Sequence, residues 1–429
     1  MAGGKGTRLH SFTEDRIPKP MASVAGRPIL EWQIECLKRN GINDICIVTG
    51  HLGEVIHSHF KDGSKFDVSI FYFNEDSPMG TAGALPHIGG FLTEPYFLLL
   101  NGDTIFDIDI SRMELHHKEK KAFVTLFVHP NSHPYDSDLV VLNSYGRIIG
   151  FDSKSNTRDY WYDNMVNAGA YILSSDICAL IPLVGKTDLE RDILFKYHQT
   201  HRMYGYFSTE YIKDVGTLDR IKQAETDISN GIVAAKNLSN KQCCIFLDRD
   251  GTINVYKGLV YNPDDFELIN SAAEAIALIN RSIYVAAVAS NQPVVARGLC
   301  EIEDVEIIHR KMKTMLGREG AYLDWVDFCP HHPDKGYPEE NPLYKISCDC
   351  RKPGTGMFIK AAQAMNIDIS KSWMVGDSAR DMEAARNTGL RSVLVRTGED
   401  ENSMRHHIRP DMVCGDILEA VKAILSEPT

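Results

Sequence analysis

Two aspartates separated by one residue are the strongest chemical signal in the chain. Asp248 and Asp250 follow the apolar segment Ile245–Leu247 and precede Gly-Thr. One carboxylate at such a position can attack phosphorus and form an aspartyl phosphate, while the other passes a proton to the leaving oxygen and takes one from water. An anionic nucleophile needs a divalent cation to approach an anionic substrate, and Mg²⁺ prefers carboxylate ligands. The pair predicts magnesium-dependent removal of a phosphate.

Three further polar clusters stand in the same part of the chain. They are Ser290-Asn291, Arg351-Lys352 and Gly376-Asp377, the last followed one helical turn later by Asp381. Hydroxyl, amide and cationic groups bind phosphate oxygens, and additional carboxylates suit the metal ion. Because open α/β sheets collect ligands at the carboxyl ends of their strands, we expect these clusters to meet at one edge of a sheet.

In this order, D-x-D-G-T, Ser-Asn, Lys and G-D-x-x-x-D resemble the haloacid dehalogenase superfamily of phosphohydrolases. The resemblance extends over residues 243–429 and outweighs the alternative that D-R-D-G-T is a solvated turn. It implies that Asp248 is the nucleophile and Asp250 the general acid and base. The resemblance and the residue types assign magnesium to Asp248, Asp250 and Asp377, a catalytic charge to Lys352, and substrate contacts to Ser290, Asn291, Arg297 and Arg351.

Two short arms of cysteine and histidine precede Lys352. Cys-Pro-His and Cys-Asp-Cys supply four nitrogen and sulfur ligands, which suit tetrahedral zinc. The predicted ligands are Cys329, His331, Cys348 and Cys350. His332 is a less favoured fourth partner, ordinary free thiols are the alternative, and a disulfide framework is disfavoured in a cytosolic chain. The zinc is expected to be structural, so that losing it should also lose activity.

The zinc loop narrows the resemblance to the group containing D-glycero-D-manno-heptose 1,7-bisphosphate 7-phosphatase and histidinol-phosphate phosphatase. The stretches F-L-D-R-D-G-T-I-N, S-N-Q-P-V-V-A-R-G and C-D-C-R-K-P-G-T-G-M are more similar to the heptose enzymes. Pro293 departs from them, because serine is more usual there. A phosphatase of another small phosphate, such as histidinol phosphate, therefore stays an alternative.

The chain begins M-A-G-G-K-G-T-R-L, a glycine-rich basic stretch of the kind that holds phosphate. It fits neither G-x-G-x-x-G nor G-x-x-x-x-G-K-[ST]. What remains is a loop of backbone N–H groups with Arg8 and, further on, Lys19, and such a loop suits a triphosphate. No apolar strand precedes this loop, so either the true start lies upstream or this half of the protein is weakened.

Two later aspartates favour metal-assisted nucleotide chemistry in the same half. Asp103 follows the apolar segment Leu98–Leu100, and Asp214 lies in I-K-D-V-G-T. Two strand-end aspartates beside a triphosphate suggest magnesium at the α-phosphate and in-line attack by another phosphate oxygen. The small-residue turn Met79–Ala84 offers backbone against which a base or ribose can lie.

The motifs G-G-x-G-T-R-L, P-K-P, G-T-A-G-A, N-G-D-T, V-N-A-G-A-Y and D-V-G-T resemble the sugar-1-phosphate nucleotidyltransferases over about residues 1–220. The opening R-L-H-S-F-T-E-D-R-I-P-K-P-M is most similar to heptose 1-phosphate guanylyltransferases. The resemblance assigns the nucleotide phosphates to Gly3, Gly4, Gly6, Thr7 and Arg8, the nucleoside to Gly80 and Gly83, and magnesium to Asp103 and Asp214.

The same resemblance implies roles toward the sugar and the transition state. Lys19 would neutralise charge in the transition state, and Asn167, Gly169 and Glu190 would face the sugar. Ordinary turn or helix-surface positions are the alternative for Asn167 and Glu190. Lys154 is a further contact to the sugar phosphate, although serine replaces the glutamate that usually precedes it.

Alternating apolar segments must position these residues. Strands are predicted at 45–49, 68–73, 96–100, 122–128 and 168–173, and again at 243–247, 283–289, 325–328, 373–375 and 392–395. Helices are predicted at 29–39, 272–280, 305–316 and 356–365. The alternation predicts an α/β fold with two largely parallel, Rossmann-like sheets, the first without its first strand and the second of haloacid dehalogenase type with a zinc loop.

The length of 429 residues suits two domains. We predict a nucleotidyltransferase-like domain over 1–224, a linker over 225–241 and a phosphatase domain over 242–429. A formal net charge of -12 disfavours nucleic acid and anionic membranes as partners. No apolar run reaches the roughly 18 residues of a spanning helix, and no leader precedes the first motif, so a cytosolic protein is expected.

The two resemblances name consecutive steps. Removing the 7-phosphate of a heptose bisphosphate produces heptose 1-phosphate, which is the substrate of the transferase. The hypothesis is a bifunctional enzyme that uses Mg²⁺ in both domains, structural Zn²⁺ in the second, sugar phosphates and a nucleoside triphosphate, in the synthesis of a nucleotide-activated heptose for surface polysaccharide. The alternative for the first domain is a non-catalytic module that binds nucleotide or sugar for regulation. The sequence does not predict an oligomeric state.

Overall fold

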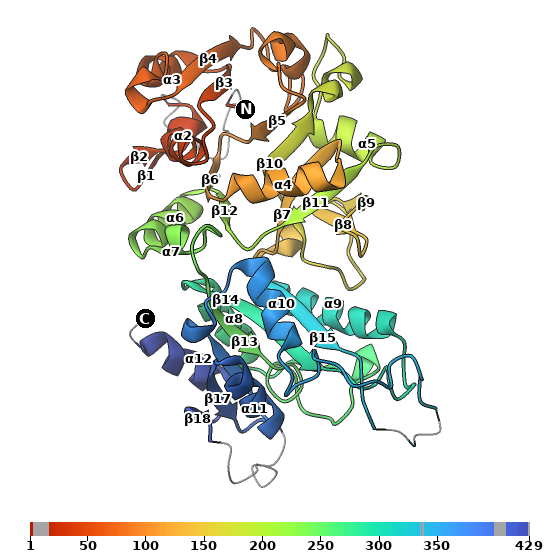
Figure 1. Cartoon of the computed structure of the whole chain (residues 1–429). Helices are drawn as coiled ribbons and strands as arrows, with labels where there is room; N and C mark the ends of the chain where they lie inside the picture. Colours follow the sequence, from red (N-terminus) through yellow and green to blue (C-terminus); the bar gives the residue numbers. More distant parts are fainter. Residues whose placement is uncertain (3–16, 335, 337–338, 399–408, 428–429) are drawn as a thin grey trace. The chain divides into compact units, whose positions relative to one another are not determined.

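The computed structural model describes residues 1–2, 17–334, 336, 339–398 and 409–427 (Figure 1). Residue contacts divide the chain into two compact units. The first comprises Met1–His129, Val140–Asp152 and Asn167–Ser239, and the second comprises Pro130–Leu139, Ser153–Val166 and Asn240–Thr429. The main change of unit therefore falls at the end of the predicted linker, and two segments from the N-terminal half are grouped with the second unit.

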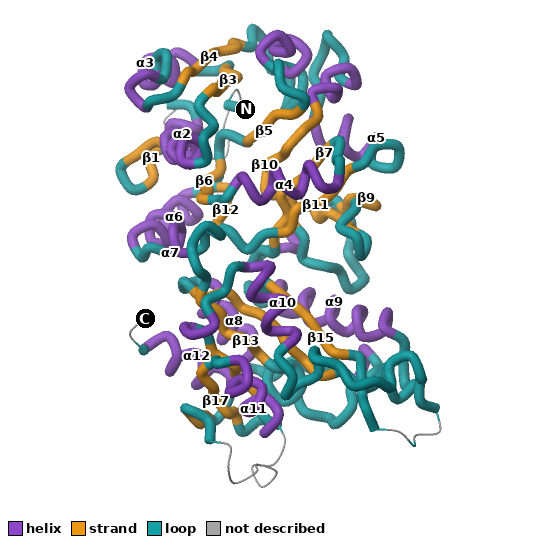
Figure 2. Tube along the Cα trace, viewed as in Figure 1, coloured by secondary structure: helices purple, strands orange, loops and turns teal. Residues whose placement is uncertain are grey.

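A six-stranded parallel sheet forms the centre of the second unit, in the order β15-β14-β13-β16-β17-β18. The strands are β13 (Cys243–Leu247), β14 (Tyr284–Asn291), β15 (Trp325–Cys329), β16 (Trp373–Gly376), β17 (Arg391–Val395) and β18 (Met412–Cys414). The helices are α8 (Ala272–Asn280), α9 (Ile302–Arg318), α10 (Gly356–Met365), α11 (Ala379–Thr388) and α12 (Ile417–Ser426), drawn in purple in Figure 2.

Successive side chains of β13 pack into two separate hydrophobic clusters. Ile245 and Leu247 belong to the cluster that contains residues of α8, α9 and α12, whereas Cys244 and Phe246 belong to the one with residues of α10 and α11. Because neighbouring side chains of a strand point to opposite faces, helices cover both faces of this sheet. Strands buried on both faces are nearly continuous apolar runs, which explains why the sequence pattern locates them.

The first unit combines several smaller sheets. Its strands are β1 (Ser23–Val24), β2 (Arg27–Pro28), β3 (Asp44–Thr49), β4 (Ser69–Asn74), β5 (Tyr96–Leu100), β6 (Thr104–Asp107), β7 (Val124–His129), β8 (Leu139–Leu142), β9 (Ile148–Asp152), β10 (Val166–Ser174), β11 (Met203–Phe207) and β12 (Tyr211–Asp214). Its α-helices are α2 (Ile29–Arg39), α3 (Gly53–Phe60), α4 (Ile110–Lys120), α5 (Phe195–Tyr197), α6 (Leu218–Ser229) and α7 (Ile232–Ala235).

Both parallel and antiparallel pairs occur among these strands. The largest sheet has the order β11-β7-β10-β8-β9, with β5 also paired to β10. The pairs β3-β4 and β11-β7 are parallel, whereas β5-β10 and β6-β12 are antiparallel. Both units are thus α/β as predicted, and the sheet of the second unit is the more regular of the two.

Met1 and Ala2 lie between β3 and β5, which are not bonded to each other. The N–H of Ala2 donates to the carbonyl of Val48 at 2.9 Å. The terminal amine of Met1 donates to the carbonyl of Leu100 at 2.8 Å, and the N–H of Gly102 donates to the Met1 carbonyl at 2.9 Å. These two residues therefore have backbone partners on both sides, as the end of a central strand would.

Beyond Met1, the space between these two strands is a cavity of about 840 Å³. Residues of β3 and β5 line it on two sides, together with residues of α2 and α4 such as Leu30, Ile34 and Ile110. Among the described residues, β3 pairs only with β4 and β5 only with β10, so each leaves one edge unbonded. The space between β3 and β5 is therefore a slot, and among the described residues only Met1 and Ala2 place backbone in it.

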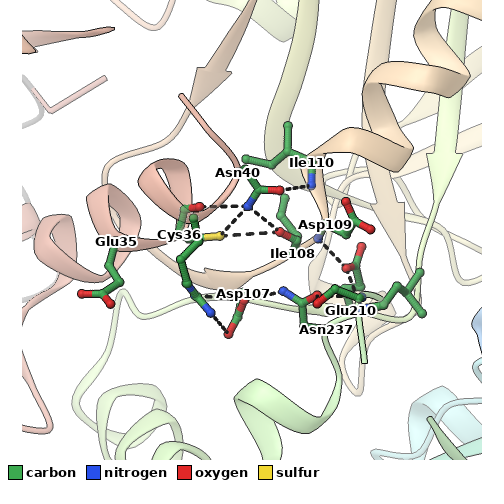
Figure 3. A network of polar contacts seen from close by, with 12 residues as sticks. Glu35, Cys36, Asn40, Asp107, Ile108, Asp109, Ile110, Glu210 and Asn237 are labelled. Carbon is green, nitrogen blue, oxygen red and sulfur yellow. Dashed lines mark hydrogen bonds and ion pairs between the residues drawn. The ribbon is translucent and has the colours of Figure 1, made fainter. Parts of the chain in front are cut away.

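The predicted linker 225–241 is largely folded. Most of it belongs to α6 and α7 or packs against the first unit. The side-chain amide of Asn237 donates to the Asp107 carboxylate at 2.6 Å, and the N–H of Leu238 donates to the Glu210 carboxylate at 2.9 Å (Figure 3). Glu210 also accepts from the N–H of Asp109 at 2.6 Å. The end of the connector is thus held by buried carboxylates of the first unit.

In the part of the chain that the structure describes, no helix combines the length and apolar character needed to cross a bilayer. All ten cysteines are free thiols.

Candidate functional site

The carboxyl ends of three parallel strands bring the predicted phosphatase residues together. Asp248 directly follows β13, which pairs with β14 on one side and β16 on the other. Asn291 ends β14, and Asp377 directly follows β16. Because the strands run in parallel, their ends share one edge of the sheet, as the sequence predicts.

Lys352 links two carboxylates at this edge. Its Nζ lies 2.9 Å from Asp248 Oδ1 and 2.6 Å from Asp381 Oδ1. The side chains of Lys352 and Asp381 are 2% and 0% exposed, so the charges are shielded from water. Asp381 is fixed from its other oxygen, which accepts from the hydroxyl of Ser378 at 2.6 Å at the start of α11. A buried cation thus balances two buried anions.

The pKa of Asp248 is raised to about 6, mainly by burial and also by the neighbouring carboxylates of Asp381 and Asp250, against the opposing effect of Lys352. Burial would lower the pKa of Lys352, but Asp248 and Asp381 outweigh it and the net direction is upward. Lys352 therefore stays protonated, while Asp248 gains its proton in mild acid.

Asp250 has hydrogen-bond partners other than Lys352. Its carboxylate accepts from the guanidinium of Arg249 at 2.9 Å, from the amide of Gln292 at 2.8 Å and from the amide of Asn254 at 3.0 Å. Arg249 is itself completely buried. These donors fix the orientation of a carboxylate that would otherwise rotate.

Within the described residues, the carboxylates of Asp248, Asp377 and Asp381 gather closely enough to share a metal ion. One oxygen of each lies within 4.8 Å of the others. Asp250, the third member of the predicted set of Asp248, Asp250 and Asp377, is engaged by its three donors and lies outside this group, and the predicted set stays a prediction. Three convergent carboxylate oxygens suit Mg²⁺.

Two glycines let the chain approach Asp377. Gly251, at φ +77°, would place a Cβ 2.3 Å from Asp377 Oδ2, and a Cβ on Gly398 would lie 1.6 Å from the same atom. Any side chain at either position would displace this carboxylate. The glycine of D-x-D-G-T is therefore required by packing as well as by the turn.

Ser290 and Asn291 form hydrogen bonds within the protein at this edge, and their predicted substrate contacts stay predictions. Ser290 is buried, and its Oγ accepts from the amide of Gln292 at 2.8 Å. Asn291 is paired with the backbone of Lys352, accepting from its N–H at 2.9 Å and donating to its carbonyl at 3.0 Å. Asn291 thereby fixes the segment that carries the lysine.

A pocket of about 290 Å³ opens over these groups. Its lining includes the carboxylates of Asp248, Asp250, Asp377 and Asp381, the cation Lys352, the arginines Arg297, Arg351 and Arg380, and Asn291, Gln292, His332 and Tyr256. Ser290 is not among the residues that line it. The pocket therefore joins the predicted nucleophile to a cationic region, as a site for an anionic substrate requires.

The four predicted zinc ligands converge on one point. Cys350 Sγ lies 3.2 Å from the sulfur atoms of both Cys329 and Cys348, and 3.3 Å from His331 Nδ1. The sulfur atoms are too far apart for a disulfide, which requires about 2.05 Å. Tetrahedral zinc with bonds of about 2.0–2.3 Å separates its ligands by slightly more than these distances, so the donor set fits zinc.

His332 belongs to the pocket and not to this cluster. Its Nδ1 accepts from the N–H of Asp334 at 3.1 Å, and the residue lines the phosphatase pocket. The guanidinium of Arg351 donates to the carbonyl of His331 at 3.1 Å. The zinc loop and the segment that carries Lys352 are therefore directly bonded.

In the first unit, Lys19 lies between the two predicted metal ligands. Its Nζ contacts Asp103 and lies 3.5 Å from Asp214 Oδ1. Asp214 also accepts from the guanidinium of Arg220 at 2.7 Å, and the N–H of Val215 donates to the carbonyl of Asp103 at 3.0 Å. The structure thus brings Lys19, Asp103 and Asp214 together, with two cations beside two anions.

Asn167, Glu190 and Tyr171 form a compact polar group. The amide of Asn167 donates to Glu190 Oε1 at 2.8 Å, and the buried Tyr171 hydroxyl donates to the same oxygen at 2.8 Å. Gly169, at φ +76°, would place a Cβ 2.5 Å from the Asn101 amide, so only glycine fits there. Asn167 and Glu190 are both partly buried, and their roles toward the sugar stay a prediction.

Gly80 and Gly83 lie in closely packed backbone. A Cβ on Gly80 would lie 2.3 Å from the carbonyl oxygen of Thr187, and one on Gly83 would lie 2.3 Å from the carbonyl oxygen of Met79. The N–H of Thr187 donates in return to the carbonyl of Met79 at 2.9 Å. This turn therefore supports the segment that leads to Glu190.

Some predicted residues receive no placement in a site. Gly3, Gly4, Gly6, Thr7 and Arg8 lie outside the described residues. Lys154 belongs to a segment grouped with the second unit, and its N–H donates to the Asp138 carboxylate at 2.9 Å.

Sequence reasoning missed several site residues. It gave no role to Arg249, Gln292, Arg220, Tyr171 and Arg380. Arg249 stands inside the D-x-D motif and Arg380 inside G-D-x-x-x-D, so both were adjacent to recognised positions. Gln292 and Tyr171 act across long sequence separations, which no local pattern reveals.

The first unit carries a lysine between two strand-end aspartates, and the second carries an aspartate–lysine pair at the edge of a parallel sheet. These features define, respectively, a nucleotidyltransferase-type and a phosphohydrolase-type α/β unit. The Nucleotidyl transferase family model matches residues 1–231, and the HAD-hydrolase-like model matches residues 349–420. The chain belongs to the Nucleotidyl transferase family and, by its second half, to the haloacid dehalogenase-type phosphatases.

Individual relatives match each half. The D-glycero-beta-D-manno-heptose-1,7-bisphosphate 7-phosphatase of Photorhabdus laumondii is 38% identical over 181 residues, which are 42% of this chain and 94% of that protein. The D-glycero-alpha-D-manno-heptose 1-phosphate guanylyltransferase of Aneurinibacillus thermoaerophilus is 31% identical over 233 residues, which are 54% of this chain and 98% of that protein. A crystal structure of D,D-heptose 1,7-bisphosphate phosphatase from B. bronchiseptica, complexed with magnesium and phosphate, covers 44% of this chain and all of that one at 32% identity and a TM-score of 0.39.

Proposed function

We propose that this bifunctional enzyme removes the 7-phosphate of D-glycero-D-manno-heptose 1,7-bisphosphate in its second unit and guanylylates the resulting heptose 1-phosphate in its first. The observation that carries the proposal is the buried Lys352, bonded to Asp248 and Asp381 in a pocket at the sheet edge. Relatives of the two halves are named for these two reactions, and the product of one is the substrate of the other. The ten free thiols fit a cytosolic enzyme.

In the phosphatase reaction, the carboxylate of Asp248 attacks the phosphorus of the 7-phosphate. The bond from phosphorus to the C7 oxygen breaks as an aspartyl phosphate forms, and Asp250 gives a proton to that oxygen. Asp250 then takes a proton from the water that hydrolyses the aspartyl phosphate, which releases phosphate and frees Asp248. The contacts of Asp250 with Arg249 and Gln292 support this role, because they hold its carboxylate in one orientation.

Both metals of the proposal have donors in the second unit. Asp248, Asp377 and Asp381 would hold Mg²⁺, whose positive charge lets an anionic nucleophile approach a phosphate. Cys329, His331, Cys348 and Cys350 would hold a structural zinc ion. Lys352 contributes a permanent positive charge at the same place, since its two carboxylate partners keep it protonated.

In the transferase reaction, a phosphate oxygen of heptose 1-phosphate attacks the α-phosphorus of GTP and pyrophosphate leaves, which produces GDP-heptose. Asp103 and Asp214 would hold Mg²⁺, and Lys19 would neutralise charge on the reacting phosphate. Asn167 and Glu190 face the sugar in this proposal, supported by their mutual hydrogen bond.

The pairing of the two units favours one anomer. The guanylyltransferase relative is named for the alpha-heptose, whereas the Photorhabdus phosphatase is named for the beta-heptose. A phosphatase that supplies an alpha-specific transferase must itself accept the alpha-bisphosphate. We therefore assign the alpha-anomer to both halves of this chain.

Phosphate release from synthetic alpha- and beta-heptose 1,7-bisphosphate tests the phosphatase. The wild-type enzyme with Mg²⁺ is expected to hydrolyse the alpha-anomer faster, and Asp248→Asn is expected to lose at least about 10³-fold, because the nucleophile is gone. Asp265→Asn, on the exposed surface, is the matched control. If Asp248→Asn released phosphate as fast as the wild-type enzyme, the proposed mechanism would be wrong.

Pyrophosphate release from GTP and heptose 1-phosphate tests the transferase. Asp103→Asn is expected to abolish it, whereas Asp219→Asn, which is exposed at the start of α6, is expected to leave it unchanged. If the wild-type enzyme released no pyrophosphate with any nucleoside triphosphate, the first unit would instead be a regulatory binding module.

A further inference from the structure

Arg249, the residue between the two aspartates of D-x-D, is bonded to both of them. Its backbone N–H donates to Asp248 Oδ1 at 2.7 Å. Its guanidinium donates to both oxygens of Asp250, with Nη2 2.9 Å from each oxygen and Nε 3.2 Å from Oδ1. One residue therefore fixes the predicted nucleophile through its backbone and the predicted acid and base through its side chain.

The hydrogen bonds of the buried Arg249 side chain serve two residues. Within the described part of the chain, this side chain donates only to Asp250 and Gln292, and its Nη1 is buried with no hydrogen-bond partner. A buried cation and an unsatisfied donor both cost free energy. An arginine that only held the fold together would be expected to have its five donors paired, since buried polar groups usually are. The Arg249 guanidinium is instead directed at one carboxylate of the pocket.

Two other ionisable groups that feel the charge of Arg249 are neutral. Burial, and next the charges of Arg249 and Lys313, hold the pKa of His309 well below its usual value. The pKa of Cys300 is raised to about 11, first by burial and then by two acidic residues at the start of α9, against the effect of Arg249. Because neither group is an anion, neither draws the guanidinium away from Asp250.

Gln292 completes a clamp on Asp250, and Arg249 sets the direction of its amide. Gln292 Oε1 accepts from Arg249 Nη2 at 3.0 Å. Gln292 Nε2 donates to Asp250 Oδ2 and to Ser290 Oγ, both at 2.8 Å. Reversing the amide would turn its oxygen toward a carboxylate and its N–H groups toward guanidinium donors, so that like groups would face each other. The guanidinium thus selects the orientation in which Gln292 donates to Asp250.

A carboxyl group that protonates a leaving oxygen needs such a clamp. The acid must lie within about 2.6–3.2 Å of that oxygen, and a misplacement of about 1 Å can cost roughly 10²-fold in rate. Asn254 adds a third donor to Asp250 at 3.0 Å, so the carboxylate is held from three residues. Precise placement matters only where the leaving group needs a proton. A sugar alkoxide needs one, whereas a thiolate does not, because thiols have a pKa of about 8.5.

We propose that Arg249 is a positioning residue which, with Gln292, holds Asp250 where it protonates the oxygen that leaves phosphorus. This inference rests on the proposed phosphatase function and deepens it. In the step concerned, Asp248 forms its bond to phosphorus while the bond from phosphorus to the C7 oxygen breaks, and the proton of Asp250 passes to that oxygen. Loss of the clamp should therefore slow an oxygen ester far more than the corresponding sulfur ester, whose thiolate leaves with its electron pair and no proton.

The experiment compares heptose 1,7-bisphosphate with the analogue that has sulfur in place of the C7 oxygen. The readout is the ratio of their kcat/KM values for phosphate release, because kcat/KM reports the steps up to the aspartyl phosphate. Arg249→Met is expected to lower kcat/KM by roughly 10²-fold for the oxygen ester and by less than about 10-fold for the sulfur ester. Asp250→Asn should change the ratio at least as much. Arg249→Lys should recover part of it, because the charge returns without the fork.

A second clamp variant and a destabilising control make the outcome decisive. Gln292→Met leaves no buried charge unpaired and should change the ratio in the same direction by roughly 10-fold, which keeps the test available if Arg249→Met does not fold. Asp324→Asn alters a buried carboxylate that accepts from the N–H of Ala286 at 2.8 Å, so it should lower the melting temperature and leave the ratio unchanged.

The outcomes separate the two levels of the proposal. If Arg249→Met and Gln292→Met slow both esters by the same factor, or slow neither, the positioning role is overturned. If the wild-type enzyme releases phosphate from neither ester, the proposed phosphatase function itself is overturned.

Discussion

The two units differ in how completely the strand before their key carboxylate is bonded. In the second unit, β13 pairs along its whole length with β14 and over Ile245–Leu247 with β16, and Asp248 follows it directly. In the first unit, β5 precedes Asp103 and is bonded to β10 on one side, while its other side faces a slot that, among the described residues, Met1 and Ala2 alone enter. A strand with partners on both sides fixes its end more firmly than one with a single partner.

The two units also stabilise their carboxylates differently. Asp248 and Asp381 share one deeply buried lysine. Asp103 and Asp214 share Lys19, but both aspartates are more than one third exposed or close to it, and Arg220 lies beside them. Exposed ion pairs contribute little to stability, whereas removing one member of a buried pair is costly. The second unit should therefore respond more sharply to single substitutions.

The largest effect is expected from the zinc cluster. Cys350→Ser should lower the zinc content of the protein and reduce phosphate release by at least about 100-fold, because structural zinc sites contribute on the order of 10 kcal/mol to folding. Cys300→Ser, a partly buried cysteine outside the cluster, is the matched control. Zinc analysis and phosphate release measured on the same samples provide the check, and full activity without zinc would contradict a structural role.

Lys352 provides the second prediction, on pH dependence. The pKa of Asp248 is raised to about 6, so the carboxylate is protonated below that pH and phosphate release should fall as the pH decreases through 6. Lys352→Met removes the cation that opposes this shift, so the acid limb should move to higher pH and the rate at pH 7 should fall by roughly 10²-fold. Rates measured from pH 5 to 9 test this.

The control for this profile is Lys371→Met, which removes an exposed lysine of the same unit. It should keep the wild-type profile. An unchanged acid limb in Lys352→Met would mean that Asp248 is not the group whose titration limits the rate.

The slot in the first unit provides the third prediction. Adding six alternating valine and isoleucine residues before Met1 should raise the melting temperature of the first unit by about 5–10 °C. Each buried apolar side chain contributes roughly 1.5–3 kcal/mol before the cost of ordering is subtracted, and each net kcal/mol corresponds to about 2–4 °C in a unit of this size.

An extension of six glycine and serine residues is the control, because it has the same length but no side chains to bury. Scanning calorimetry on both proteins measures the difference. Identical melting of the two extended proteins would show that the cavity of about 840 Å³ does not accept a strand.

The sequence alone was sufficient to predict the bounds of elements that have a clear local pattern. The predicted bounds of β5, β13, α2, α8 and α10 agree with the structure residue by residue, because each is an uninterrupted apolar or amphipathic run. Strands β11 and β12 were missed, since M-Y-G-Y-F contains a glycine and Y-I-K-D is short and half polar. The strand β18 was also missed, because its three residues are too few to form a recognisable pattern.

For the candidate sites too, the sequence predicted some features and not others. The four zinc donors and the pair of Asp248 with Lys352 followed from types and spacing. The closeness of Asp381 to Asp248 and the contact of Gln292 with Asp250 did not, because each joins segments that are distant in the sequence. Partners that join distant segments are set by the packed fold, so a local motif cannot reveal which carboxylate is already engaged.

The smallest effect is expected from Glu210, a buried acid of the first unit. Burial raises its pKa to about 7, above the value near 4.5 of an exposed glutamate. Between these two values the folded protein binds more protons than the unfolded one, so the contribution of Glu210 to stability declines as the pH rises from about 4.5 to 7 and then stays constant. Glu210→Gln cannot ionise, and it should remove this part of the pH dependence.

The measurement is the melting temperature of Glu210→Gln and of the wild-type protein at each pH from 5 to 8. Asp248 titrates in both proteins, so their difference isolates Glu210, whose effect should not exceed about 3 kcal/mol. Glu119→Gln, exposed on α4, should follow the wild-type curve. Because Glu210 accepts from the N–H groups of Asp109 and Leu238, a constant difference across this range would mean that these donors keep it ionised. In that case buried acids in the two units would titrate differently, Asp248 near pH 6 and Glu210 well below it.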